Sequence, residues 1–397
     1  MKQDIDQGTA ARSALRLGAV GDILVDRDEP HTAFARSTAV LDDVDVLFGN
    51  CEAVYADGVH PAPSASIPVL GKPEHGRDLG KAGFDVMSLA NNHTVDGGYE
   101  GLRQTLRLLH DQDIVTCGGG ENRAQAVAPA VIERNGWRIA FLAYTCVYPA
   151  GYEAGTDTPG LAVLRTHDIY VRSEMDAFQS GGAPERLTVL DPRDLRTLRS
   201  HIADARRTAD VVVVSVHAGD GSRPAVVLDY ERDIARAAID AGADAYLGHH
   251  HHMLRGAEYY RGKPVFYGLG HFVFDVPDFE SQVPPSILAR MAEHAGEYGY
   301  GYRDDGYPLL PMHPEARMTV FAVCDFDPDG TVHAGVVATR LNPEGQPVPL
   351  DPAGEDGAVV LGYLRDITGR AELSADWRVG DRTVGGYRVI DLVESVS

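Results

Sequence analysis

Short runs of β-branched and other apolar residues alternate with amphipathic stretches over most of this chain, and this alternation restricts the fold more than any other feature. The runs predicted to be buried strands are residues 15–20, 44–48, 85–89, 139–144 and 211–216. The stretches predicted to be helices are residues 99–110, 194–208 and 230–241. Strands that alternate with helices in this way are typical of an α/β fold.

The pattern predicts one main domain with additions at both ends. We expect residues 1–14 to be an N-terminal tail, residues 15–345 the main domain, and residues 346–397 a C-terminal extension that packs on it. Two segments, 147–190 and 276–316, break the alternation and are rich in Gly, Pro and Tyr. Because loops of this length in a compact domain are often functional, we expect both to shape a substrate site.

Polar residues follow five predicted strands at their carboxyl ends, the fifth strand being the short run 245–247. These segments are Gly21-Asp22, Asn50-Cys51-Glu52, Asn91-Asn92-His93-Thr94-Val95-Asp96, His217-Ala218-Gly219-Asp220 and the histidine run 249–252. In open α/β sheets, ligands bind outside the carboxyl ends of the strands. Oxygen and imidazole ligands together suit divalent cations, so the sequence predicts a site for one or two ions of Mn, Zn, Fe or Ca.

Four consecutive histidines, residues 249–252, occupy one of these strand ends. In an extended backbone, alternate side chains point to the same side. His250 and His252 are therefore predicted to enter the site together as ligands. His249 and His251 are expected to face the other way, with His249 a weaker candidate near the cation and His251 exposed.

Composition excludes several classes of partner. The net charge of −22 argues against nucleic acid and against an anionic membrane surface as partners.

The sequence also predicts where the protein is located. No apolar run approaches the roughly 18 residues of a membrane span, and the N-terminus lacks the pattern of a signal peptide. The four cysteines form no CxxC pair, which suits a reducing compartment. We therefore expect a cytoplasmic protein.

The order of the motifs resembles that of the CapA family, the poly-γ-glutamate capsule-synthesis proteins within the calcineurin-like metallophosphoesterase superfamily. The family pattern runs GDxxxxR, NxE, GFDVxSLANNHxxDxG, HWGxE, GHHPHxxxG and YSLGNFxFD. The matching stretches here are residues 21–27, 50–52, 83–97, 217–219, 248–252 and 266–275, so the resemblance covers about residues 15–275. It implies a four-layer αββα sandwich, here with loop insertions, and a metal centre where the strands end.

The resemblance also implies roles for individual residues. The metal-ligand set carried over from the family is Asp22, Glu52, Asn92, His217, His250 and His252, with Glu52 as the bridge between two ions. His93 corresponds to a histidine beside the metals that acts as general acid or base, and Asp96 would orient it. Arg27 would face the substrate, although a surface ion pair is an equal alternative.

Four departures of the sequence from the family pattern bear on the site. The tryptophan and glutamate of HWGxE are Ala218 and Gly221, the asparagine of GNF is His271, and the proline of GHHPH is His251. We also expect no membrane anchor, which capsule proteins of this family usually carry. These differences argue against capsule synthesis and leave the ligand set intact.

Three functions are consistent with these residues. The favoured one is epimerisation of a peptide residue at Cα, in which a cation stabilises the enolate while one group removes the proton and another returns it. Soluble CapA-like relatives include an epimerase of ribosomally made lasso peptides, which suggests a ribosomally made peptide as the partner. The alternatives are metal-dependent hydrolysis of a phosphoester or amide bond, and a non-catalytic metal-containing binding module.

Several residues are candidates for proton transfer and for substrate binding. The catalytic candidates are His93, Asp96, His271, Asp26 and His294. The substrate-binding candidates are Arg27, His249, Tyr298 and Tyr300, the last two from the second long loop.

Overall fold

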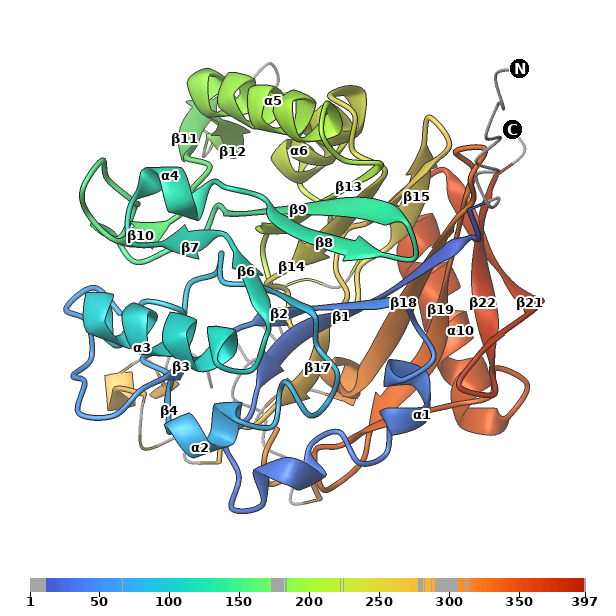
Figure 1. The fold of residues 1–397 in the computed structure, drawn as a ribbon, viewed down its shortest axis with the longest axis horizontal. Coiled ribbons are helices and arrows are strands. Elements are labelled where there is room, and N and C mark those ends of the chain that lie inside the picture. The colour runs from blue at the N-terminus through green and yellow to red at the C-terminus, as the bar shows by residue number, and fades with distance from the viewer. Residues whose placement is uncertain are drawn as a thin grey trace, which may run out of the picture.

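A computed structural model of the 397-residue chain describes residues 12–65, 67–172, 182, 184–221, 223, 225–277, 281, 283–286, 288–289, 306–310, 312 and 314–395. Among these residues, none of the helices is both long enough and apolar enough to cross a lipid bilayer. Two large β-sheets dominate the fold (Figure 1).

The larger sheet has ten strands and mixes parallel with antiparallel pairing. Its main path is β21 (Ala375–Val384), β22 (Tyr387–Glu394), β19 (Val332–Leu341), β18 (Met318–Phe326), β1 (Leu15–Leu24), β2 (Val46–Cys51), β5 (Val86–Ser88) and β6 (Val115–Cys117). Two more strands, β17 (His271–Phe274) and β20 (Pro347–Pro349), pair with β1 and β19. The neighbours β1, β2, β5 and β6 are parallel, so their carboxyl ends meet at one edge.

The smaller sheet has six strands. Its order is β15 (Ala257–Tyr260), β16 (Lys263–Phe266), β14 (Ala245–His249), β13 (Val211–His217), β9 (Trp137–Thr145) and β8 (Ala130–Arg134). Strands β9, β13, β14 and β16 are parallel. The register of β13 places His217 beside His249 on one side and Thr145 on the other.

The two sheets pack against each other through an apolar core. Phe48 of β2 and Phe141 of β9 stack across this interface, with ring centroids 5.5 Å apart and planes 6° from parallel. Both rings are buried. Aliphatic residues from β1, β13, β14 and β18 fill the remaining space, so this core fixes how the two sheets meet.

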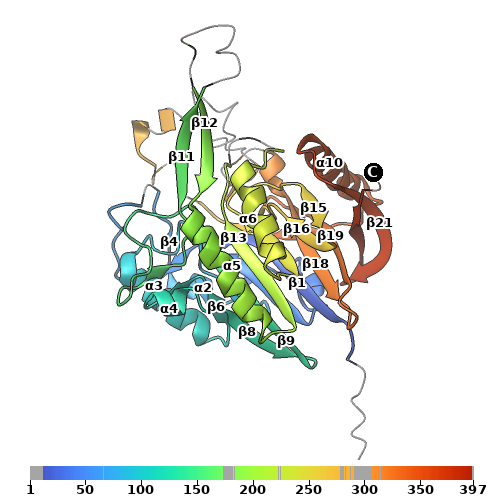
Figure 2. The same cartoon turned by 90° about the horizontal axis from the view of Figure 1, so that it is seen from above.

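Helices cover the outer faces of the sheets. Helices α5 (Pro192–Arg206) and α6 (Asp229–Asp240) pack on the smaller sheet through a second core, as Figure 2 shows from above. Helix α3 (Gly98–His110) packs on the larger sheet through a third core, and α10 (Glu355–Arg370) contributes to the core between the sheets. The short helices are α1 (Thr38–Leu41), α2 (Pro73–Gly76), α4 (Arg123–Ala126), η1 (Pro30–Thr32) and η3 (Pro314–Arg317).

Three two-stranded sheets complete the described fold. They pair β3 (Val54–Tyr55) with β4 (Leu70–Gly71), β7 (Gly119–Gly120) with β10 (Gly160–Leu161), and β11 (Thr166–Val171) with β12 (Glu185–Leu190). Three of these strands lie in the segment 147–190, which the sequence predicted as loop. The hairpin β11–β12 projects away from the body of the protein (Figure 2).

The expected mixed α/β fold is confirmed, and the predicted helices agree with α3, α5 and α6 to within two residues at each end. The C-terminal residues were predicted as an extension. In the structure, β20, β21 and β22 extend the larger sheet, because β22 pairs with β19.

Substitution of Phe141 tests the importance of the core between the sheets. We expect Phe141→Ala to lower the free energy of unfolding by about 3–5 kcal/mol, because it leaves a cavity in a closely packed interface. Phe141→Leu, which keeps most of the volume, should cost much less. Urea unfolding measures both variants, and a loss below about 1 kcal/mol for Phe141→Ala would show that the stacked pair does not hold the sheets together.

Candidate metal centre

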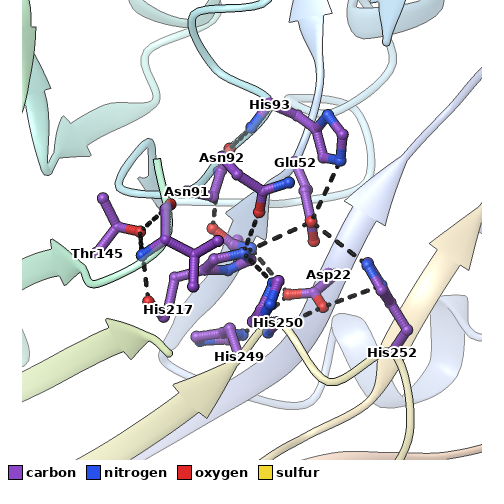
Figure 3. A network of polar contacts seen from close by, with 12 residues as sticks. Asp22, Glu52, Asn91, Asn92, His93, Thr145, His217, His249, His250 and His252 are labelled. Atoms are coloured by element: carbon purple, nitrogen blue, oxygen red, sulfur yellow. Dashed lines mark hydrogen bonds and ion pairs between the residues drawn. The ribbon is translucent and has the colours of Figure 1, made fainter. Parts of the chain in front are cut away.

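The six predicted metal ligands lie together at the edge where strands of both sheets end (Figure 3). Asp22 lies in β1, and Glu52 follows β2 directly. Asn92 lies in the loop after β5, His217 ends β13, and the histidine run begins at the end of β14. The centre therefore combines residues that are far apart in the sequence and that come from two different sheets.

Two groups of ligand atoms share one carboxylate. Glu52, His217 and His250 form the first group, and Asp22, Glu52 and His252 form the second. Within each group, all ligand atoms lie within 4.8 Å of one another. A carboxylate common to two such groups is the arrangement that a bridge between two cations requires.

Short contacts order the imidazoles around Glu52. The atom Nε2 of His217 lies 2.6 Å from Oδ1 of Asn92, 3.1 Å from Nδ1 of His250 and 3.6 Å from Oε1 of Glu52. The same glutamate oxygen lies 3.7 Å from Nε2 of His252, whose Nδ1 lies 3.6 Å from Asp22. One side of His217 is thus surrounded by an amide oxygen, a carboxylate and a second imidazole.

The charge balance of the centre favours a cation. Asp22 and Glu52 are both fully buried, and neither oxygen of Glu52 accepts a hydrogen bond from the described residues. Burial, and then the neighbouring Asp22, raise the pKa of Glu52 well above its usual range. Burial also favours a neutral Asp22, but the imidazole of His249, 3.3 Å away, and His217 lower the pKa of Asp22 overall.

The imidazoles themselves are suited to coordinate a metal ion. Burial, and then the neighbouring His250, lower the pKa of His217 well below its usual value, and burial lowers the pKa of His250 to about 4. Burial also lowers the pKa of His252. These rings are neutral near pH 7, and neutral imidazole is the form that binds metal. Neutral imidazoles around two buried carboxylates, one without hydrogen bonds, fit divalent cations.

His93 lies beside the centre and is held by Asp96. Its Nδ1 lies 2.7 Å from Oδ2 of Asp96, and its Nε2 lies 4.0 Å from Oε1 of Glu52. Asp96 is itself buried and accepts a 2.7 Å hydrogen bond from the backbone N–H of Val69. The carboxylate thus fixes the ring and leaves Nε2 directed toward the centre.

Two asparagines that were not among the predicted site residues support the carboxylate side. Asn50 donates a 2.8 Å hydrogen bond to Asp22 and accepts one from Asn91. The Oδ1 of Asn91 accepts from the backbone N–H groups of His93 and Thr94, which shapes the loop that carries His93. Asn50 belongs to the motif NxE and Asn91 to the motif ANNH, so the motifs could have indicated that both residues lie at the site.

The histidine run adopts a different backbone from the one predicted. Strand β14 ends at His249, and the next residues turn: φ is +99° at His250 and +55° at His252. Positive φ at residues other than glycine costs about 1–3 kcal/mol each and persists only where neighbouring contacts enforce it. His250 and His252 therefore converge through a strained turn and not through strand alternation.

The other two histidines of the run correct the prediction. His249 does not face away, because its Nδ1 lies 3.3 Å from Oδ1 of Asp22. With 1% of its surface exposed, His249 lies beneath the centre, out of reach of a substrate. His251 is not exposed either: it is 2% accessible, and its Nε2 lies 2.9 Å from Oε1 of Glu231.

Arg27 does not present a free guanidinium to a substrate. Its Nε and Nη2 donate to the two oxygens of Asp275 at 2.7 and 2.5 Å. Its Nη1 and Nη2 also donate to the backbone carbonyls of Glu344 and Gly345. Arg27 thus ties the end of β1 to the segment after β17 and to the turn before β20, and the ion pair is buried, not on the surface.

The remaining predicted catalytic residues lie in different surroundings. Asp26 contacts Nδ1 of His75 at 3.0 Å and, with Arg27, lines a neighbouring cavity of about 880 Å³. His271 is completely buried and packs on Phe274 and the ring of His252. The remaining three candidates, His294, Tyr298 and Tyr300, lie outside the described residues.

Comparison with known proteins identifies the family. The sequence profile of the bacterial capsule synthesis protein family PGA_cap matches residues 16–276. This chain belongs to the PGA_cap family. The match coincides with the segment that carries the motifs, and it confirms the resemblance to CapA proteins.

Relatives of this PGA_cap protein cover most of its length. The protein y4sH of Sinorhizobium fredii is 32% identical over 379 residues, covering 80% of this chain and 82% of that protein. The capsule biosynthesis protein CapA of Bacillus anthracis is 28% identical and covers 76% of this chain and 67% of its own. The PGA biosynthesis protein CapA of Bacillus subtilis is 29% identical, with coverages of 67% and 65%.

The shared carboxylate predicts unequal effects of ligand substitutions on metal content. We expect Glu52→Gln to reduce the occupancy of both cation positions, because Glu52 belongs to both groups. His250→Ala and His252→Ala should each reduce mainly one. Elemental analysis of chelator-free protein measures the content, with the exposed His333→Ala as control. Unchanged metal in the Glu52 and both histidine variants would contradict a metal centre.

The raised pKa of Glu52 predicts that Glu52→Gln changes the stability of the metal-free protein by an amount that depends on pH. A carboxyl group with a higher pKa in the folded than in the unfolded chain binds extra protons when folded. Its contribution to stability is therefore lost as pH rises from the unfolded value of about 4.3 through the folded pKa. In chelator-treated protein, the gain in stability of Glu52→Gln over wild type should grow from pH 5 to pH 8. A gain that does not change with pH would contradict this.

Proposed function

We propose that this PGA_cap protein is a metal-dependent hydrolase that cleaves a phosphoester or amide bond, with His93 as the acid–base group. The observation that carries this proposal is the sharing of Glu52 between two groups of ligand atoms. Paired divalent cations, when bound, supply Lewis acidity and lower the pKa of water at the site. Asp22, Glu52, Asn92, His217, His250 and His252 are the proposed ligands. The two sheets with helices on their outer faces would then correspond to the four-layer sandwich of metallophosphoesterases.

The surroundings of His93 support its proposed role as the group that gives a proton to a leaving group. Because Asp96 engages Nδ1, the proton available for transfer resides on Nε2, which faces the centre. The side chain of His93 is 14% exposed, whereas that of Glu52 is fully buried. A substrate can therefore reach His93 from the open side while the carboxylates remain behind it. Asp96, 2.7 Å from Nδ1, keeps the ring in this orientation.

A peptide-like chain is the proposed substrate class, in the cytoplasm. The Bacillus relatives are named for biosynthesis of a capsule and of PGA. Poly-γ-glutamate is an amide polymer, so γ-glutamyl peptides are the first amide substrates to test, alongside a panel of phosphoesters. The acidity of this chain, with a net charge of −22, favours short substrates over long polyanions.

Epimerisation at Cα, which the sequence favoured, has weaker structural support. It requires a second proton-transfer group on the opposite face of the substrate. His271, one candidate for that group, has no exposed surface, and His249 lies beneath the centre. We therefore favour hydrolysis, and detection of epimerisation in its place would overturn the proposed function.

Replacing His93 separates acid–base chemistry from metal binding. We expect His93→Gln to keep its metal content and its fold, and to lose about 10²- to 10⁴-fold in turnover, the usual contribution of a general acid. The exposed histidine variant His110→Gln serves as control. If His93→Gln loses metal instead, His93 is a ligand and the proposed division of roles is wrong.

Incubation with candidate substrates in D₂O distinguishes the two reactions. Hydrolysis predicts products of lower mass or released phosphate, observed by mass spectrometry and a phosphate assay. Gain of about one mass unit at a single residue, without cleavage, would instead establish epimerisation.

A further inference from the structure

The histidine turn is anchored by its one member that points away from the centre. His251 lies between the two proposed ligands His250 and His252, and its ring points toward helix α6. There, Nε2 of His251 lies 2.9 Å from Oε1 of Glu231. The two side chains are only 1% and 3% exposed, so this contact is shielded from water.

Two glycines make the slot that holds the ring of His251. A Cβ on Gly219 would lie 2.1 Å from Nε2 of His251 and 2.6 Å from Oε1 of Glu231. A Cβ on Gly268 would lie 2.9 Å from Nδ1 of the same ring. Any side chain at either position would collide with His251 or with its partner. The ring is therefore held from both edges as well as by its hydrogen bond.

Glu231 is fixed independently of His251. Its second oxygen, Oε2, accepts a 2.8 Å hydrogen bond from the backbone N–H of Leu228 and so caps the first turn of α6. The neighbouring residue Tyr230 accepts a 2.8 Å hydrogen bond from the backbone N–H of Gly219, two residues after His217. The start of α6 is thus attached to both the histidine turn and the end of β13.

We propose that His251 and Glu231 are positioning residues, which hold the strained turn so that His250 and His252 face the cation site. Strained dihedrals persist only where the surroundings enforce them, and His250 and His252 carry positive φ on either side of this anchor. The pair does this without touching the centre. This inference rests on the proposed metal centre for its effect on cation affinity, but its effect on the turn does not depend on a metal.

His251→Ala tests the anchor, because it leaves the proposed ligands and the cap of α6 in place. Hydrogen exchange of metal-free protein, followed by mass spectrometry, should show faster exchange in a peptide covering residues 249–254. Competition with a chelator should show that the variant binds the cation at least about 10-fold more weakly than wild type, which is the usual effect of losing a group that orients ligands. His251→Gln, whose amide can still donate to Glu231, should recover part of both.

His201→Ala is the matched control. His201 is partly buried, whereas His251 is fully buried, and Nδ1 of His201 lies 2.9 Å from the hydroxyl group of Tyr144 in a pocket outside the centre. It should leave exchange of residues 249–254 and cation affinity unchanged. If His251→Ala does not fold, His251→Leu, which fills the space of the ring without its hydrogen bond and keeps the cap of α6, replaces it, with the same two expectations.

The outcomes separate this inference from the proposed function. Exchange of residues 249–254 and cation affinity both at wild-type values in the His251 variant would overturn the anchor. A weaker affinity with unchanged exchange would overturn it too, because the effect would then not act through the turn. If wild type binds no cation, the metal centre fails, and the exchange measurement on metal-free protein still decides whether the pair holds the turn.

Discussion

The buried carboxylate of Glu52 imposes the main constraint on this structure. A charged group without hydrogen bonds, away from water, is costly unless a counter-charge lies next to it. Burial lowers the pKa of His217 and of His252, so these rings next to Glu52 are neutral and do not provide that charge, and Asp22 is a second carboxylate. The missing positive charge explains the rest of the centre. Neutral imidazole nitrogen atoms face the carboxylates, Asn50 donates a hydrogen bond to Asp22, and Asn91 donates one to Asn50.

The parts of the site that the sequence predicted are those set by local structure. Asp22, Glu52 and His217 each lie in or directly after a parallel strand, so recognising the strand was enough to place the residue at the common edge. His93 and Asp96 are three residues apart in one loop, and their contact follows from that spacing and the family motif. Helix α3 was equally accessible, because its apolar residues recur with helical spacing.

The parts that the sequence did not predict depend on contacts between distant segments. The turn at His250 and His252 requires room that Gly219 and Gly268 provide and a partner from α6, none of which is local to the histidine run. Arg27 fits the family motif, but only the fold shows that Asp275 and two backbone carbonyls occupy its guanidinium. The strands β21 and β22 were hidden for the same reason, since their place in the sheet depends on pairing with β19.

The proposed ligands come from both sheets, and this has a consequence for the order in which the protein folds and binds a cation. Asp22 lies in β1 and Glu52 follows β2 of the larger sheet, while His217 ends β13 and the other two histidines follow β14 of the smaller one. Neither half of the chain contains the whole set, so the centre cannot assemble until the sheets have docked through Phe48 and Phe141. If the proposed cations bind, they can do so only after the two sheets have packed together, and bound cations would then stabilise this packing.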